Sequence, residues 1–265
     1  MNESKIKIFA FYHKPMPVVV DDGVNCPLMV GRGADGFLCD NTGDNISAMN
    51  PHYCELTGIY WLWKNIDDCD IIGTCHYRRY YTARPEPLLY RLKRLTYWPT
   101  RLYGKRYGLI YTNNLALFRP RILSGPEIEQ IFEMYDAILP TPRRLRYSVA
   151  THYCRYHSAR ELTLLEDVIR EQCPDYMPEF EQVMNSNRLY ANNMFVLRRE
   201  QFRQYAEWLF PLLFAIEKRI DFQTLTGYQT RVMGFIAERL LNVWFARQQL
   251  NVAELPLIYF KKIKI

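Results

Sequence analysis

The chain opens with polar and apolar residues in alternation, a pattern typical of a strand. Lysine alternates with isoleucine and alanine over residues 5–12, and prolines follow shortly afterwards. An apolar run over 70–81 indicates a second, buried strand. Further strands are expected at 135–139, 189–197 and 254–260.

Stretches of helical periodicity lie between these strands. Aromatic and aliphatic residues recur at helical spacing over 50–65, where Asn50 followed by Pro51 is a typical N-cap and first turn. Serine followed three residues later by glutamate predicts capping boxes at Ser124 and Ser158. Further helices are expected from Ser158 to about 172, at 176–184, and as two long segments around 202–216 and 232–243.

Strands that alternate with helices predict an α/β fold, a three-layer αβα arrangement with a mostly parallel central sheet. The chain has 265 residues, 49% of them hydrophobic, which is enough for a real core. No repeat or flexible linker interrupts it. We therefore expect a single domain over 1–265, with a basic, aromatic insertion at about 82–108.

The positive charge is concentrated in that insertion. Lysine and arginine outnumber aspartate and glutamate by 34 to 28, and residues 84–106 hold seven basic side chains against one glutamate. Such a local excess indicates a surface for a partner. Leu88, Leu92 and Leu95 lie at helical spacing there, which fits either an amphipathic helix on an anionic membrane or ordinary core contacts.

Other features narrow the class of protein. Seven scattered cysteines give neither a disulfide framework nor a metal knuckle, so reduced thiols in the cytoplasm are expected. The first residues lack the apolar stretch of a secretion signal, and no run approaches the roughly 20 apolar residues that cross a bilayer. The sequence predicts a protein that is neither exported nor membrane-spanning.

The run over 70–81 ends in the most informative group of side chains. His76, Tyr77, Arg78 and Arg79 follow its apolar part, where an open α/β sheet builds anion sites. Paired guanidiniums suit a phosphate ester, because each offers a planar fork of donors and a permanent charge. His13 and Lys14, after the first strand, add a second positive wall at the same sheet edge. A salt-bridge cluster and a solvated loop are the alternatives.

Three further places carry polar groups that could bind a substrate. The long loop 35–47 offers short polar side chains to a sugar, or simply forms Asx turns: Asp40, Asn41, Thr42, Gly43, Asp44 and Asn45. Asn192 and Asn193 begin a predicted strand and either hold hydroxyls or cap the backbone. Glu238 and Arg239 lie in an apolar helix, where a carboxylate must be functional or paired with Arg231 or Arg239.

At this point the chain resembles the bacterial capsular and exopolysaccharide glycosyltransferases of the DUF4422 type. The resemblance covers essentially the whole chain, and the GDNIS and HYRRY motifs make it specific. It rests on residues 13–15, 40–47, 50–65, 72–80, 193–195 and 234–244. The chain departs from the usual pattern at Asn41, where a second acidic residue is common, and in its insertion after Tyr81.

The resemblance implies a GT-A-like fold, a nucleotide-sugar donor and an acceptor sugar on a membrane lipid; some relatives transfer galactofuranose from UDP. Many GT-A enzymes hold Mn²⁺ or Mg²⁺ with an acidic D-x-D motif at a strand end. In this chain the corresponding strand is followed by His76, Arg78 and Arg79 instead. We therefore expect no metal ligands and no required cofactor, and a requirement for Mn²⁺ or Mg²⁺ stays open as the alternative. Asp68 and Asp70 precede the strand, at the wrong end for the cleft.

The predicted function is transfer of a hexosyl group from a nucleotide sugar, UDP-linked, to a lipid-linked bacterial glycan at the cytoplasmic face of the plasma membrane. Glu238 is the predicted base, with Asp44 in reserve, and Arg78 and Arg79 stabilise the leaving diphosphate. We further expect His13 and Lys14 to bind the nucleotide, and Asp40, Asp44, Asn45 and Asn193 to bind the sugar hydroxyls. The alternatives are a sugar-phosphate transferase and a basic-patch protein that binds membranes or nucleic acid, although no nucleic-acid motif is present.

Overall fold

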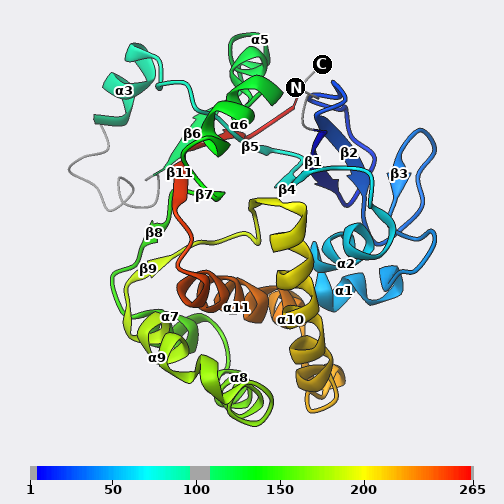
Figure 1. Ribbon diagram of the computed structural model, residues 1–265, viewed down its shortest axis with the longest axis vertical. Helices are drawn as coiled ribbons and strands as arrows, with labels where there is room; N and C mark the ends of the chain where they lie inside the picture. Colours follow the sequence, from blue (N-terminus) through cyan, green and yellow to red (C-terminus); the bar gives the residue numbers. More distant parts are fainter. Residues whose placement is uncertain (1–4, 96–107, 264–265) are drawn as a thin grey trace.

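A central sheet organises the protein, which we describe from a computed structural model over residues 5–95 and 108–263 (Figure 1). Its strands are β1 (Ile6–Tyr12), β2 (Asn25–Met29), β3 (Leu38–Cys39), β4 (Ile71–His76), β5 (Arg79–Tyr81), β6 (Leu109–Thr112), β7 (Ala137–Pro140), β10 (Val196–Arg198), β11 (Val252–Leu255) and β12 (Leu257–Phe260). The main path runs β11-β7-β10-β4-β1-β2-β3, and β12 pairs with β5 and β6. A separate ribbon joins β8 (Arg143–Arg144) to β9 (Arg188–Leu189).

Helices cover both faces of this sheet. The α-helices are α1 (Asn50–Tyr53), α2 (Leu56–Asn65), α3 (Leu88–Leu95), α5 (Leu115–Phe118), α6 (Gly125–Phe132), α7 (Val149–Tyr156), α8 (Ala159–Gln172), α9 (Met177–Asn185), α10 (Arg199–Glu217) and α11 (Val232–Gln248). Short 3-10 turns, at Ser47–Met49, Arg119–Arg121, Pro174–Tyr176, Phe222–Thr224 and Gly227–Arg231, connect some of them.

The side chains of β1 alternate between two hydrophobic cores, as its sequence pattern predicts. Phe9 and Phe11 pack in the larger core, with α2 and with α8 to α11. Ile8 and Ala10 point to the opposite face, into the core that includes α6. In Figure 1, α10 and α11 accordingly lie on one side of the sheet and α5 and α6 on the other. The predicted three-layer α/β arrangement is confirmed.

The predicted parallel pairing and one capping box are also confirmed. Strand β1 pairs in parallel with both β2 and β4, so their carboxyl ends meet at one edge. Strand β10 enters antiparallel between β4 and β7, which leaves the sheet mostly parallel. The Glu127 carboxylate accepts from the Ser124 backbone N–H at 2.9 Å and opens α6 as expected.

The expected helix over 50–65 is broken into two helices. Cys54 has a φ of 53°, which ends α1 before α2 begins. Asn50 is therefore not an N-cap; it lies inside α1, and its amide donates across the break to the Cys54 carbonyl and the Thr57 hydroxyl. The break turns Cys54 and Glu55 toward the carboxyl edge of the sheet, where both line a cavity.

Three predicted strands and one predicted cap are also wrong in detail. The run over 70–81 folds back after His76 into β5, which pairs antiparallel with β4. The segment 189–197 is irregular before β10, because Asn192 and Asn193 have φ values of 76° and 48°. The segment 254–260 divides at Pro256 between β11 and β12. At α8, Ser158 is the N-cap as predicted, but its hydroxyl accepts from the Arg160 N–H, and the Glu161 carboxylate accepts from Tyr153.

The predicted insertion is described only in part. Its described part ends in α3, over Leu88–Leu95, whose leucines are exposed: Leu88 by 67%, Leu89 by 78%, Leu92 by 51% and Leu95 by 53%. This exposure rules out the alternative in which these leucines form core contacts. The basic and aromatic residues predicted over 96–107 lie outside the described residues. None of the described helices is long and apolar enough to span a bilayer.

Candidate active site

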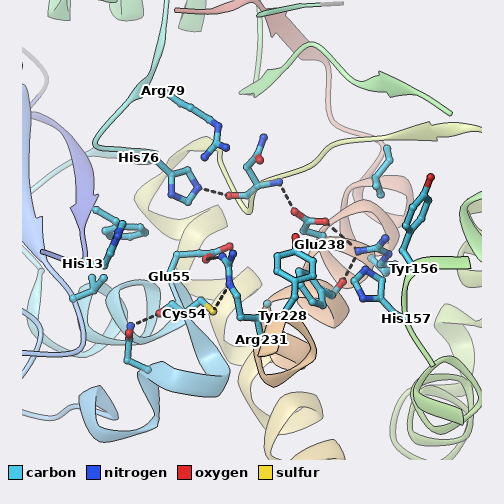
Figure 2. A pocket seen from close by; sticks show the side chains of 18 of the residues that line it. His13, Cys54, Glu55, His76, Arg79, Tyr156, His157, Tyr228, Arg231 and Glu238 are labelled. Carbon is cyan, nitrogen blue, oxygen red and sulfur yellow. Dashed lines mark hydrogen bonds and ion pairs between the residues drawn. The ribbon is translucent and has the colours of Figure 1, made fainter. Parts of the chain in front are cut away.

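A cavity of about 710 Å³ opens at the carboxyl ends of β1 and β4, and we call it the main cavity (Figure 2). Because parallel strands end at one edge, residues that follow different strands converge there. The lining brings together eight of the predicted site residues: His13, His76, Tyr77, Arg78, Arg79, Asn192, Glu238 and Arg239. It adds groups not singled out from the sequence, among them Glu55, Arg143 and Arg231.

The tight turn between β4 and β5 sends Arg78 and Arg79 into this cavity. Since the strand has already ended, the two side chains need not point to opposite faces. Arg78 donates to the Lys261 carbonyl at 3.2 Å and lies over the Tyr77 ring. The Arg79 guanidinium lies 5.0 Å from the centre of the Tyr259 ring.

Arg79 carries a charge without an anionic protein partner. Among the described residues, no carboxylate pairs with its guanidinium and no acceptor hydrogen-bonds to it; the guanidinium lies against the Tyr259 ring instead. Burial lowers the pKa of Arg79, but an arginine stays protonated at any ordinary pH. A partly buried, permanent cation that no protein group neutralises is a ready site for an anion.

Burial lowers the pKa of His13 and of His76, two of the four histidines that line the main cavity, which argues against the expectation that His13 adds positive charge. Burial is the main cause that lowers the pKa of His76 to about 3. Its Nε2 lies 2.8 Å from the Asn192 carbonyl, which can only accept, so Nε2 carries the proton and Nδ1 is free to accept. Burial, with Lys14 and Arg78 nearby, likewise lowers the pKa of His13.

The neutral His76 predicts a pH-dependent stability. Between about pH 6.5 and the folded pKa of about 3, the unfolded chain binds a proton that the folded protein does not. Its contribution therefore lowers the free energy of unfolding as pH falls, by up to about 1.4 kcal/mol per pH unit. His76→Gln keeps a donor for the Asn192 carbonyl. When the free energy of unfolding is measured in urea between about pH 5 and pH 7, it should fall less steeply with falling pH in this variant than in wild type. The same dependence on pH in both proteins would contradict a neutral, buried His76.

Asn192 holds three groups of the main cavity in place. Its carbonyl accepts from His76, its N–H donates to the Glu238 carboxylate at 2.8 Å, and its side-chain oxygen accepts from Arg143 at 3.2 Å. The left-handed backbone at Asn192, with a φ of 76°, aims these groups at three different elements. Asparagine tolerates that conformation better than most residues.

Two substitutions separate the backbone role of Asn192 from its side-chain role. Asn192→Gly keeps the left-handed backbone and removes the hydrogen bond to Arg143, whereas Asn192→Ala also introduces strain at Cβ. We expect the alanine variant to be about 1 kcal/mol less stable than the glycine variant. Equal denaturation midpoints would contradict a strained backbone at this position.

Glu238 and Arg239 form an ion pair at the wall of the main cavity. The Glu238 carboxylate lies 3.0 Å from Arg239 Nη1, and the Arg239 side chain is only 2% exposed. Arg239 also donates to the Phe235 carbonyl and lies over the Tyr153 ring. Arg239 therefore holds Glu238 in one orientation, with one carboxylate oxygen on Arg239 and the other on the Asn192 N–H.

A second carboxylate, Glu55, faces the same cavity and was missed from the sequence. It accepts from the Asn193 amide at 2.8 Å and lies 3.8 Å from Arg231, which also contacts the Cys54 sulfur. Burial raises the pKa of Glu55, and Asn193 and Arg231 oppose the rise. Asn193 thus orients Glu55 and is itself buried, outside the lining. The break at Cys54, which no local pattern marks, is what turns Glu55 inward.

Comparison with known proteins places the chain in a family. The family profile described as "Domain of unknown function (DUF4422)" matches residues 7–249. The chain belongs to the DUF4422 family. The predicted resemblance is thereby confirmed across almost its full length.

Among solved structures, this DUF4422 protein is similar to the bifunctional glycosyltransferase WbbM in its apo form. The TM-score is 0.82 at 29% sequence identity. The match covers 97% of this chain and 46% of the WbbM chain, so the protein spans about half the length of that enzyme. The fold is GT-A-like, as expected. No curated protein matches the chain.

The loop that carries the DUF4422 motif GDNIS lies outside the lining of the main cavity. Its carboxylates form hydrogen bonds near the loop and to the neighbouring α2. Asp40 accepts from the Gly31 N–H and the Ser47 hydroxyl, and Asp44 accepts from Tyr60 of α2. None of the predicted sugar ligands of this loop is among the lining residues, namely Asp40, Asn41, Thr42, Gly43, Asp44 and Asn45, and the exposed Lys14 is absent too. Their roles at the substrate stay predictions, and the contacts favour the structural alternative.

Proposed function

We propose that this protein is a glycosyltransferase that moves a hexosyl group from a nucleoside diphosphate, UDP by expectation, to a hydroxyl of a bacterial glycan. The observation that carries the proposal is the unpaired Arg79 guanidinium in the main cavity, within the described part of the chain. The likeness to a bifunctional glycosyltransferase over 97% of the chain supports the reaction class. Galactofuranose is the sugar that the family resemblance suggests.

The proposed reaction separates charge between two sides of the main cavity. As the sugar C1–oxygen bond to the diphosphate breaks, negative charge grows on the leaving phosphate, where Arg79, with Arg78 and Arg231, stabilises it. The acceptor oxygen forms the new bond to C1, and its proton passes to the Glu238 carboxylate. Direct displacement of this kind inverts the configuration at C1. Aromatic faces on the same wall, Tyr156, Tyr228 and Phe235, suit the apolar face of a sugar ring.

Fixed guanidiniums would do here what a divalent ion does in many GT-A enzymes. In the part of the chain that the structure describes, no three His, Cys, Asp or Glu side chains are grouped so that they could hold an ion. The lining carries Arg78, Arg79, Arg143 and Arg231 around the space, beside the buried Arg239. We therefore propose that turnover needs no added metal, with Mn²⁺ and Mg²⁺ as the ions to test.

A panel of UDP- and GDP-sugars tests the function directly. We expect one UDP-sugar to raise the melting temperature and to be slowly hydrolysed with release of UDP, equally with and without a chelator. Release of UMP with transfer of phosphate would instead indicate a sugar-phosphate transferase. Failure of every nucleotide sugar to bind would contradict the proposal, and loss of turnover with chelator would contradict metal independence.

We further propose that α3 attaches the protein to the inner face of the plasma membrane. Its exposed leucines, with Arg84 and Arg91 nearby in the sequence, suit an anionic lipid surface. Leu89→Glu combined with Leu92→Glu should reduce sedimentation with anionic vesicles by at least about tenfold, because two buried apolar contacts become charges. Unchanged sedimentation, or binding to oligonucleotides in place of vesicles, would contradict this location.

A further inference from the structure

Two tyrosines that line the main cavity are also exposed to solvent. Tyr156 is 63% exposed and Tyr228 is 61% exposed. Every other tyrosine in the described part of the chain is at least partly buried. Large aromatic faces that stay open to solvent beside a cavity are typical of a surface that a ligand covers.

A packed group of rings supports these tyrosines. The side-chain nitrogen of Gln229 donates to the Tyr156 carbonyl at 2.8 Å, so the 3-10 turn before α11 lies against the end of α7. The Tyr228 ring packs on Phe235 with their centres 4.8 Å apart, and the Phe235 ring lies 4.1 Å from the ring of His157. We call this group, Tyr156, His157, Tyr228 and Phe235, the aromatic wall.

Gln229 also determines which nitrogen of His157 carries the proton. A carbonyl can only accept, so the amide nitrogen of Gln229 faces Tyr156 and its oxygen faces His157. Burial lowers the pKa of His157, which leaves the ring neutral at pH 7. Nδ1 lies 3.1 Å from the Gln229 oxygen and therefore carries the proton. Nε2 is then a lone pair to which no described residue donates.

The aromatic wall lies next to Glu238. Phe235 and Glu238 are three residues apart on α11, so they share one face of the helix, and both line the main cavity. The charge of Glu238 acts on the pKa of both His76 and His157, which shows that the carboxylate is near both rings. In Figure 2, His157 lies on one side of Glu238 and Arg79 on the other.

We propose that the aromatic wall is the binding site of the acceptor sugar: the ring stacks against Tyr156 and Tyr228, and one hydroxyl donates to Nε2 of His157. The proposal deepens the proposed function and rests on it. Arg79 binds the donor diphosphate, and Glu238 lies between the two substrates, where a base for the acceptor oxygen is needed. A second hydroxyl of the same sugar is the nucleophile.

The charges behind the aromatic wall indicate a neutral acceptor sugar. Arg231 lies 3.8 Å from the Glu55 carboxylate and Arg239 lies 3.0 Å from that of Glu238, so both arginines already have anionic partners. A sugar acid would place a further carboxylate beside Glu238. The lone pair on His157 likewise favours a hydroxyl, which donates, over a group that only accepts.

Titration of methyl hexosides in saturating UDP tests the aromatic wall separately from the donor side. We expect at least one hexoside of the panel to bind, as measured by saturation-transfer NMR. One of its monofluoro analogues should bind about tenfold more weakly, because fluorine keeps the size of the hydroxyl but cannot donate to His157. In His157→Phe, the parent hexoside and that analogue should bind equally, since phenylalanine keeps the packing on Phe235 and has no lone pair.

A pair of tyrosine variants tests the stacking. Tyr228→Ala removes an exposed aromatic face and should weaken binding of the hexoside about three- to tenfold. Tyr147→Ala is the matched control and should leave it unchanged, because the Tyr147 ring packs on Arg155 and lies outside the lining of the main cavity. The fluoro series in wild type decides the inference even where a variant fails to fold.

Each contrary outcome overturns a stated part of the inference. Equal binding of the parent hexoside and all its fluoro analogues, or the same fluorine effect in wild type and His157→Phe, would remove His157 from the site. Wild-type affinity in a folded Tyr228→Ala protein, or failure of every hexoside to bind while UDP binds, would overturn the aromatic wall as the acceptor site. Failure of UDP itself to bind would count against the proposed function instead.

Discussion

Arg79→Ala is expected to lower kcat by about 100- to 1,000-fold, the usual cost of removing one preorganised donor at a developing charge. The reason is structural: within the described residues, Arg79 is a cation that the protein leaves unpaired in the main cavity. The substitution removes charge stabilisation that is needed most when the diphosphate departs. Folding should change little, because the interaction of this guanidinium with the Tyr259 ring is worth about 0.5–1 kcal/mol.

Two other variants make the Arg79 result interpretable. Arg170→Ala removes an arginine that pairs with Glu166 at the surface of α8, and it should leave kcat unchanged. Arg79→Lys keeps the charge but loses the planar fork, so its kcat should fall between wild type and alanine. Steady-state kinetics and thermal melts measure all three. Wild-type kcat in a folded Arg79→Ala protein would remove Arg79 from the mechanism.

Glu238→Gln is expected to lower kcat by about 100- to 10,000-fold, the range for loss of a general base. Glutamine can still accept from the Asn192 N–H, so the main cavity should keep its shape and its affinity for UDP. The variant leaves Arg239 without its carboxylate partner, and some loss of stability is therefore expected. Turnover measured at a temperature well below the melting point of the variant separates the loss of the base from the loss of stability.

Glu55→Gln is the comparison that decides which carboxylate is the base. Glu55 faces the main cavity beside Arg231 and Cys54, and its carboxylate accepts from the Asn193 amide. We expect this substitution to raise KM for the donor more than it lowers kcat. A larger fall in kcat for Glu55→Gln than for Glu238→Gln would reverse the assignment.

The sequence predicts the layers of this fold well because they depend on short-range patterns. The alternation of polar and apolar residues predicted β1, and the capping box at Ser124 predicted the start of α6. Since β1 and β4 are parallel, the residues that follow them had to meet at one edge, and His13, Arg78 and Arg79 do line one cavity. Charge and strand ends were sufficient to find the centre of the candidate site.

Other parts of the site depend on backbone features that leave little local signal. The positive φ at Cys54 turns Glu55 inward, and the left-handed pair after Ala191 turns a predicted strand into a loop around Glu238. Arg143 reaches the site from a two-residue strand. The length of the loop at Asp40 indicated binding, whereas Asp40 accepts from Gly31 and Ser47 within this region, so its role at the substrate stays a prediction.

The central claim is that Arg79 binds the phosphate that leaves the sugar, and calorimetric titration of UDP and UMP tests it most directly. Wild type should bind UDP at least about tenfold more tightly than UMP, because the second phosphate adds a charge-assisted contact. In Arg79→Ala that preference should disappear, with the affinity for UMP little changed. An Arg79→Ala protein that prefers UDP over UMP as strongly as wild type does would contradict the account.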